Sequence, residues 1–367
     1  MASVEKRPHA DGRPRYLVRW RGPDGAQRSK TFTRKIDADR HAVAVESSKL
    51  VGAYVDPRAS GITVDQWADR WLAGKTNLAP STKATTATLL DTHVRPRFGP
   101  VKLADLRRED LQAWIAGIDR KPATVRRIHQ VVSPLLGAAV KSGRLAVNPA
   151  AGLDLPRVRR PDKRYLTHAQ VDALAEACGP DWSLMVRLLA YTGLRWGEMA
   201  ALTVKRVDLL RRRVTVAESV TPVRGRLVWG DTKSHERREV PIPKFLAADL
   251  EALMSWRDGP DDQLFTGPLG GVPRSRTLQR SALTAAAKAI GAPGLTPHEL
   301  RHTAASLAIA SGADVKVVQR MLGHKSATMT LDLYGHLFPD RLDQVADAMT
   351  AARELEMTRP TVVELRR

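Results

Sequence analysis

Alternation of apolar and polar residues near the start of the chain predicts a β-hairpin. Residues 15–21, RYLVRWR, alternate with the two-residue period of a strand, and QRSKTF at 27–32 has the composition of a second strand. Between them, GPDG at 22–25 has the residues of a tight turn. The two strands are therefore expected to pair in antiparallel fashion.

A helical stretch follows this hairpin. Thr33 is its candidate cap, and Ile36, Val43 and Leu50 recur at intervals of seven residues, which would align them on one face of a helix. Residues 1–58 are thus predicted to form a small unit in which a helix backs a β-hairpin.

Between residues 62 and 141 the apolar residues recur with helical spacing. Three helical stretches are predicted near 80–94, 108–118 and 122–141, with RPRFGPVKL as a break between the first two. An earlier one, ITVDQWADRWLAG at 62–74, has apolar residues at i, i+3, i+4, i+7 and i+8 behind a candidate Thr63 cap, namely Val64, Trp67, Ala68, Trp71 and Leu72. Residues 62–150 are therefore predicted to be an all-α domain.

The second half of the chain is predicted to be a separate, mainly α domain. Residues 151–162 lie in a proline-containing stretch without periodicity and are predicted to be a linker. Residues 163–353 alternate helices with short strands around 214–220 and 227–242, and 354–367 form a tail. The predicted fold class is α+β and multidomain, with a small antiparallel sheet in this second domain.

Net charge indicates the kind of partner. The 367 residues carry a formal charge of +20. Residues 1–60 contribute +6, residues 61–160 contribute +9 and the remaining 207 residues +5, so the first 160 residues hold most of the excess. A polyanion, most commonly nucleic acid, fits this balance, with a membrane surface as the alternative. No apolar run approaches the ~18 residues of a spanning helix and the start has no apolar signal core, so a cytoplasmic protein without membrane contact is expected.

A set of polar residues in the second half can perform phosphodiester chemistry. The segments HELRHTAAS and MLGHKSATMTLDLYGHL, with YTGLRWGE upstream, contain Arg195, His298, Arg301, His302, His324 and Tyr334. Planar guanidinium groups bind the nonbridging oxygens of a phosphodiester in pairs, and a tyrosine hydroxyl can attack the phosphorus and hold the cut end as an ester. The single cysteine, Cys178, excludes an internal disulfide and a cysteine zinc site.

These segments resemble the signature boxes of the tyrosine recombinase (phage integrase) family, and in particular a three-domain integrase of a temperate phage or mobile element. The matching features are the TGLR turn with Glu198 three residues beyond Arg195, the HxLRHT run at 298–303, LGH at 322–324 and Tyr334 ten residues after His324. A family lysine between the boxes is matched by Lys233 in DTKSHERREVPIP. The resemblance covers roughly residues 163–350, about half the chain.

The resemblance implies a role for each matched residue. Arg195 and Arg301 would clamp the phosphate, Tyr334 would be the nucleophile, and Lys233 would protonate the departing 5′-oxygen. The remaining matches would handle the nucleophile's proton, contact a nonbridging oxygen and orient the basic groups, and these are His298, His324 and Glu198 in that order. His302 is expected to point elsewhere on its helix, and no cofactor or metal is expected.

The resemblance also implies an arm-binding domain at 1–58, a core-binding domain at 62–150 and a catalytic domain at 163–353. Candidate DNA contacts, each of which could equally be a solvated surface charge, are Arg19, Arg21, Arg28, Lys30, Lys83, Arg126 and Arg127. The implied partners are double-stranded DNA with core and arm sites, further copies in a homo-tetramer that passes through a Holliday junction, an excisionase and a host DNA-bending protein.

Three alternatives remain open at this point. HELRH fits the zinc pattern HExxH, and the surrounding boxes and basic balance argue against that interpretation. A type IB topoisomerase-like enzyme would use the same residues to relax DNA without recombining it. A non-enzymatic DNA-binding protein descended from a recombinase is the third, although no residue of the catalytic set is missing from the sequence.

Overall fold

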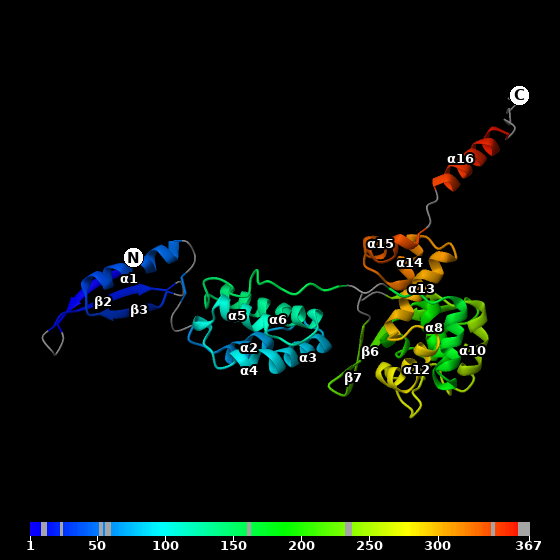
Figure 1. The fold of residues 1–367 in the computed structure, drawn as a ribbon, viewed down its shortest axis with the longest axis horizontal. Coiled ribbons are helices and arrows are strands. Elements are labelled where there is room, and N and C mark those ends of the chain that lie inside the picture. The colour runs from blue at the N-terminus through cyan, green and yellow to red at the C-terminus, as the bar shows by residue number, and fades with distance from the viewer. Residues whose placement is uncertain are drawn as a thin grey trace, which may run out of the picture. The chain divides into compact units, whose positions relative to one another are not determined.

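The structure, a computed structural model, describes most of the chain: residues 1–8, 13–22, 25–50, 54–55, 60–159, 163–231, 237–338 and 342–358. It divides into two compact units, Met1–Arg160 and Pro161–Arg367 (Figure 1). Among the described residues, no helix has the length and apolar character needed to cross a membrane.

The first unit begins with an antiparallel sheet of order β1-β2-β3 covered by a helix. Its elements are β1 Ser3–Arg7, β2 Arg15–Arg21, β3 Gln27–Phe32 and α1 Lys35–Leu50. The predicted hairpin strands are confirmed as β2 and β3. Strand β1 was not predicted, because SVEKR has one apolar residue and is recognisable as a strand only through its pairing with β2.

The buried face of α1 differs from the expected one. Ala38 and Val45 pack against two β2 residues in a small core, whereas Ile36, Val43 and Leu50 are 48%, 70% and 87% exposed. A helix face that carries alanine can approach a sheet more closely than one that carries three large side chains, so the face with the smaller residues is buried. The helix was predicted correctly, but its heptad of large apolar residues points to solvent.

Residues 62–141 are helical, as predicted, and are called the helical domain below. Its helices are α2 Val64–Ala73, α3 Pro80–Leu89, α4 Arg95–Phe98, α5 Arg108–Ala116 and α6 Pro122–Lys141, with a π-helical turn η1 at Leu90–Val94 and a 3₁₀ turn η2 at Leu103–Asp105. Thr63 caps α2 through a capping box with Gln66, as a polar residue ahead of the apolar run predicted. The Trp67 indole packs in the core and donates to the Leu135 carbonyl at 2.9 Å.

The predicted break at RPRFGPVKL is shorter than expected. Helix α3 continues through η1 into α4, and the helical path ends only at Phe98. Pro96 has no N–H to donate and would crowd the preceding turn of a regular helix. The widened π-helical turn directly before it lets the chain continue in helical form.

Residues 148–156, ahead of and within the predicted linker, contact the helical domain. The side chain of Asn148 donates to the Ser133 carbonyl at 3.0 Å, Arg108 donates to the carbonyls of Ala151 and Gly152, and Leu153 is buried in the helical core.

The second unit places helices around two small antiparallel sheets, as the predicted fold class requires. One sheet has the order β4-β5-β8 and the other is the β6-β7 hairpin, which projects from the body of the unit (Figure 1). The strands are β4 Val207–Asp208, β5 Arg213–Val216, β6 Glu218–Val223, β7 Arg226–Asp231 and β8 Arg238–Pro241. The helices are α7 His168–Ala177, α8 Pro180–Thr192, α9 Trp196–Met199, α10 Lys244–Met254, α11 Ser275–Leu278, α12 Thr284–Ala289, α13 Pro297–Ala310, α14 Val315–Leu322, α15 Ala327–Tyr334 and α16 Leu342–Met357, and the shorter helical turns are η3 Val204–Arg206, η4 Gln279–Leu283 and η5 Gly335–Leu337.

One continuous apolar core holds these elements together. It joins residues of α7, α8, β5, β8, α10 and α12 to residues of α13, α14 and α15. The candidate catalytic residues that the structure describes lie at or near the ends of α9, α13, α14 and α15, so the packing of these helices fixes their positions.

Candidate active site

Arg301 lies in the second turn of α13 and only 3% of the residue is exposed. Its Nη1 donates to the Gly193 carbonyl at 2.5 Å, and its Nη2 donates to the Leu322 carbonyl. Burial, and after it the charge of Arg195, lower the pKa of Arg301 to about 9, so the guanidinium remains charged at neutral pH. Arg301 thereby joins the C-terminal ends of α8 and α14 at the site.

Those two helix ends depend on glycine. Gly193 and Gly323 both adopt the left-handed conformation, with φ of 65° and 64°. A Cβ on Gly193 would lie 2.5 Å from a methyl carbon of Leu322, and one on Gly323 would lie 3.0 Å from Cδ of Arg238. The chain turns sharply at both points, which brings their carbonyls and the residues that follow them into the site.

Glu198 is a buried carboxylate that binds two arginines. Its Oε2 accepts from the Arg195 backbone N–H at 2.9 Å, which caps α9, and its Oε1 accepts from Nη1 of Arg195 at 2.7 Å. Arg238 donates to the same two oxygens at 3.1 and 2.6 Å. Burial by itself raises the pKa of Glu198, but the hydrogen bonds and charges of the two arginines outweigh it and hold that pKa below its usual value.

Tyr334 ends α15 and is 1% exposed. Its hydroxyl lies 2.7 Å from Nδ1 of His302 on α13. The expectation that His302 points elsewhere is therefore wrong, because the end of α15 lies beside the part of α13 that carries His302. Burial raises the pKa of Tyr334 to about 12, against the opposing effect of Arg301, so the hydroxyl is fully protonated at neutral pH.

The other two histidines lie beside this pair. The His298 ring is 5.4 Å from that of His302, and the His324 ring is parallel to the Tyr334 ring at 6.4 Å. Nδ1 of His324 lies 3.0 Å from the hydroxyl oxygen of Thr330. Burial first, and neighbouring positive charges second, lower the pKa of His302 and that of His324 to about 4, so both rings are neutral at pH 7.

Lys163 is a site residue that the sequence did not single out. Its Nζ donates to the Leu333 carbonyl at 2.6 Å and lies 5.2 Å from the centre of the Tyr334 ring. In the sequence it is only one of several basic residues at the predicted start of the domain, and no family box contains it. The contact joins residues 170 positions apart, which no local spacing predicts.

Lys233 lies outside the described residues. The described chain places the end of β7 at Asp231 and the start of β8 at Arg238, on either side of it. Its predicted role as general acid remains a prediction.

Comparison with known proteins places the chain in a family. Residues 164–341 match the model described as Phage integrase family, and residues 64–155 match the model of the Phage integrase central domain. A tyrosine recombinase XerC from Corynebacterium efficiens is 31% identical over 253 residues, which cover 65% of this chain and 76% of that protein. The chain belongs to the phage integrase family of tyrosine recombinases.

One further relative and one solved structure are similar to most of this recombinase. The integrase of Mycobacterium phage L5 is 26% identical over 340 residues, which cover 88% of this chain and 90% of the phage protein. A solved structure, a lambda integrase tetramer bound to a Holliday junction, has a similar fold, with a TM-score of 0.59 and 19% identity over 88% of this chain and 96% of that one.

The zinc interpretation of HELRH has no support in the recombinase. Glu299 is engaged as a helix cap, since its Oε2 accepts from the Thr296 backbone N–H at 2.7 Å and from its hydroxyl at 2.9 Å. His302 faces Tyr334 instead of sharing a ligand position with His298. Among the described residues no cluster of three or more histidine, cysteine or acidic side chains could hold a metal ion.

The four predicted DNA contacts in the N-terminal hairpin fall on opposite faces of the sheet. Arg28 and Lys30 of β3 pair with Trp20 and Val18 of β2, which are buried against α1. Cross-strand partners project to the same face. Arg28 and Lys30 therefore emerge at the margin of the helix-covered face.

Arg19 and Arg21 project from the open face of the sheet. Arg19 pairs with Ser29, Arg21 pairs with Gln27, and Arg19 also forms an ion pair with Glu5 at 3.3 Å. Arg19 and Arg21 therefore lie on the face of the sheet that α1 leaves uncovered.

In the helical domain, two of the three predicted DNA contacts are exposed. Lys83 on α3 and Arg127 on α6 both project to solvent. Arg126 instead donates from Nε to the Pro156 carbonyl at 2.7 Å, because the chain after α6 folds back along the helix. Arg126 therefore has a structural role within the protein, which explains its presence without a contact to DNA.

Proposed function

We propose that this protein is the integrase of a phage or related mobile element, a site-specific recombinase that cuts DNA through a 3′-phosphotyrosine intermediate and rejoins it to a new partner. Site-specific cleavage and rejoining of DNA follow from its family. The assignment of the reaction steps to individual residues is our proposal.

The observation that carries the proposal is that a tyrosine hydroxyl, two neutral histidine rings and a charged arginine lie together in one site. Tyr334 ends α15, Arg301 and His302 lie on α13, and His324 follows the end of α14. These three helices share one core, and the charge of Arg301 acts on both Tyr334 and His324. A nucleophile, a hydrogen-bond acceptor for its proton and a phosphate-binding guanidinium are the groups that phosphoryl transfer to tyrosine requires.

In the forward step the Tyr334 oxygen attacks the phosphorus, and the bond from phosphorus to the 5′-oxygen breaks. The hydroxyl proton passes to Nδ1 of His302, which lies within hydrogen-bond distance and is neutral at pH 7. Lys233 gives a proton to the leaving 5′-oxygen. The product is a 3′-phosphotyrosine ester and a free 5′-hydroxyl, and attack by the 5′-hydroxyl of another strand reverses each transfer.

Arg195 and Arg301 act on the phosphate in different ways. Arg195 is 27% exposed and keeps donors available for substrate, while Glu198 holds one end of its guanidinium. Arg301 donates to two backbone carbonyls, so these hydrogen bonds fix the position of its charge in the site. Charge that builds up on the nonbridging oxygens is thereby met by donors already in place, which lowers the barrier without a metal.

We further propose the assembly and partners expected of such an enzyme. Arg19 and Arg21 on the open sheet face would contact arm-type DNA, and the helical domain with the catalytic domain would hold core sites. A homo-tetramer acting through a Holliday junction is supported by the assembly named for the lambda relative. An excisionase and a host bending protein remain expectations.

The test is recombination between two copies of the DNA that flanks this gene, placed on one supercoiled plasmid. A recombinase yields deleted or inverted plasmids whose junctions can be sequenced. Relaxed plasmid without rearrangement supports the topoisomerase alternative. Binding with neither product supports the non-enzymatic alternative.

A further inference from the structure

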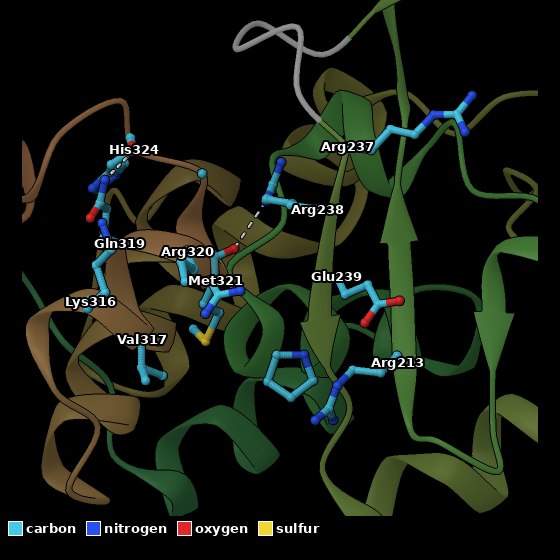
Figure 2. A pocket seen from close by; sticks show the side chains of 12 residues that line it. Arg213, Arg237, Arg238, Glu239, Lys316, Val317, Gln319, Arg320, Met321 and His324 are labelled. Atoms are coloured by element: carbon cyan, nitrogen blue, oxygen red, sulfur yellow. Dashed lines mark hydrogen bonds between the residues drawn. The ribbon is translucent and has the colours of Figure 1, made fainter.

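Arg238, the first residue of β8, is a largely buried arginine that no predicted role includes. Its side chain is 8% exposed, and its guanidinium donates in two directions. Nη1 and Nη2 donate to the two carboxylate oxygens of Glu198 at 3.1 and 2.6 Å. Nε donates to the Met321 carbonyl at 3.1 Å, the contact drawn as a dashed line in Figure 2.

Through Glu198, Arg238 is connected to Arg195, one of the candidate catalytic arginines. Glu198 Oε1 accepts from Arg238 and from Nη1 of Arg195 at once, so the two guanidinium groups share one buried carboxylate. Without Arg238, Arg195 would be the one charged partner left to this carboxylate among the residues that the structure describes. Arg195 would then be drawn further onto Glu198 and away from a bound phosphate.

Through the Met321 carbonyl, Arg238 is connected to the turn that precedes His324. Met321 precedes Leu322, whose carbonyl accepts from Arg301, and the chain then turns at Gly323 into His324. Gly323 also lies directly against the Arg238 side chain, since a Cβ there would meet its Cδ, Nε and Cζ at 3.0 to 3.2 Å. One planar group therefore fixes both the carboxylate and the turn that carries His324.

We infer that Arg238 is a positioning residue of the recombinase: through Glu198 and the 321–324 turn it holds Arg195, Arg301 and His324 in their relative places around the scissile phosphate. The role rests on the proposed function of this site. Lysine could supply the charge but not the three donors in one plane, so Arg238→Lys is expected to lose the positioning while keeping Glu198 paired.

The experiment compares two DNA substrates under single-turnover conditions with full-length protein. Both carry the same duplex from the gene's flanking DNA, chosen because the unaltered protein binds it. One has the natural phosphodiester at the scissile position, and the other has a methylphosphonate, in which an uncharged methyl replaces one charged oxygen. A misplaced arginine clamp matters less for the neutral methylphosphonate, because less negative charge has to be stabilised.

The variants are Arg238→Lys, Arg238→Met and the control Arg237→Met. Arg237 is the exposed neighbour one residue earlier, and its side chain points away from Met321 (Figure 2). We expect both Arg238 variants to bind DNA normally but cleave the phosphodiester about 100-fold more slowly, the usual effect of a lost oxyanion donor. On the methylphosphonate the loss should shrink to about tenfold or less, while Arg237→Met cleaves both substrates as the unaltered protein does. If Arg238→Met does not fold, Arg238→Lys decides alone.

Each other outcome has a definite meaning. An equal loss on both substrates would show general damage to the domain and overturn the positioning role, as would an Arg238→Lys rate close to that of the unaltered protein. If the unaltered protein forms no covalent complex on either substrate, the proposed function itself fails, and the role of Arg238 fails with it.

Discussion

The hydroxyl of Tyr334 and Nδ1 of His302 lie 2.7 Å apart, across the contact between α15 and α13. Tyr334 is 1% exposed, and the contact places the hydroxyl of this proposed nucleophile within hydrogen-bond distance of a neutral imidazole. His302 therefore joins the proposed catalytic set.

Replacing His302 should reduce the cleavage rate, and by less if the new side chain can accept a hydrogen bond from the Tyr334 hydroxyl. His302→Phe removes the acceptor and should slow formation of the covalent complex about 100-fold, within the usual range for general base catalysis. His302→Asn retains an oxygen near the position of Nδ1 and should retain part of the rate. Single-turnover cleavage of a core-site duplex measures both.

A matched control for this comparison lies elsewhere in the same unit. Nδ1 of His168 lies 2.8 Å from the Tyr191 hydroxyl, which repeats the same pair of groups outside the site. His168→Phe should leave the cleavage rate unchanged within about threefold, since exposed substitutions outside the site have small effects. An equal loss in His168→Phe and His302→Phe would mean that only folding is being measured.

The lowered histidine pKa values predict acid destabilisation of the catalytic domain. Burial, with the charges of His298, Lys163 and Arg301, holds the pKa of His302 near 4, below the value of about 6.5 that it has when unfolded. Between those values the unfolded chain binds a proton that the native chain does not. Protonation of His302 therefore does not reduce the free energy of unfolding above about pH 6.5, and it reduces that free energy progressively as the pH falls from 6.5 toward 4.

The measurement for this effect is the melting temperature between pH 7.5 and 4.5. The unaltered protein should lose more of its melting temperature over this interval than His302→Asn, which has one fewer group to titrate. Parallel curves for the two proteins would contradict the lowered pKa of His302.

The proposed role of Lys233 predicts selective chemical rescue. Lys233→Ala should cleave a normal core site slowly, because the 5′-oxygen leaves without a proton. A substrate with sulfur in place of that oxygen needs little protonation and should restore the rate. Rescue of Lys233→Ala but not of Tyr334→Phe supports general acid catalysis, whereas no rescue would leave Lys233 with phosphate binding alone.

The two faces of the N-terminal sheet predict unequal effects on DNA binding. Replacing Arg19 and Arg21 by alanine removes charge from the open face and should reduce the salt dependence of arm-site binding by about two phosphate contacts. Replacing Arg28 and Lys30, at the helix-covered face, should do less. Core-site cleavage should survive in both double variants, and a larger effect from Arg28 and Lys30 would reverse the assignment of the faces.

Elements with strong local periodicity were predictable from the sequence. The strands β2 and β3 and the 20-residue helix α6 begin and end at the predicted residues, because alternation and helical spacing depend only on neighbouring positions. The candidate catalytic residues could likewise be named from the sequence, because the family boxes keep them at fixed spacing, and their individual roles remain predictions.

What the sequence could not predict depends on contacts between distant segments. Nothing in RREVP distinguishes buried Arg238 from exposed Arg237, and only the packing of β8 against α14 separates them. His302 and Lys163 reach Tyr334 from positions 32 and 171 residues away in sequence. Strand β1 and the buried face of α1 were missed for the same reason, since each is set by the sheet it contacts.

The most direct test of the central claim asks whether Tyr334 becomes joined to DNA. The unaltered protein and Tyr334→Phe are each incubated with a supercoiled plasmid that carries the gene's flanking DNA, and the products are separated on a denaturing SDS gel. A covalent protein–DNA band that forms with the unaltered protein and is absent from Tyr334→Phe, although the variant still binds the plasmid, is the predicted result. A covalent band of equal strength in Tyr334→Phe would place the nucleophile elsewhere and contradict the account.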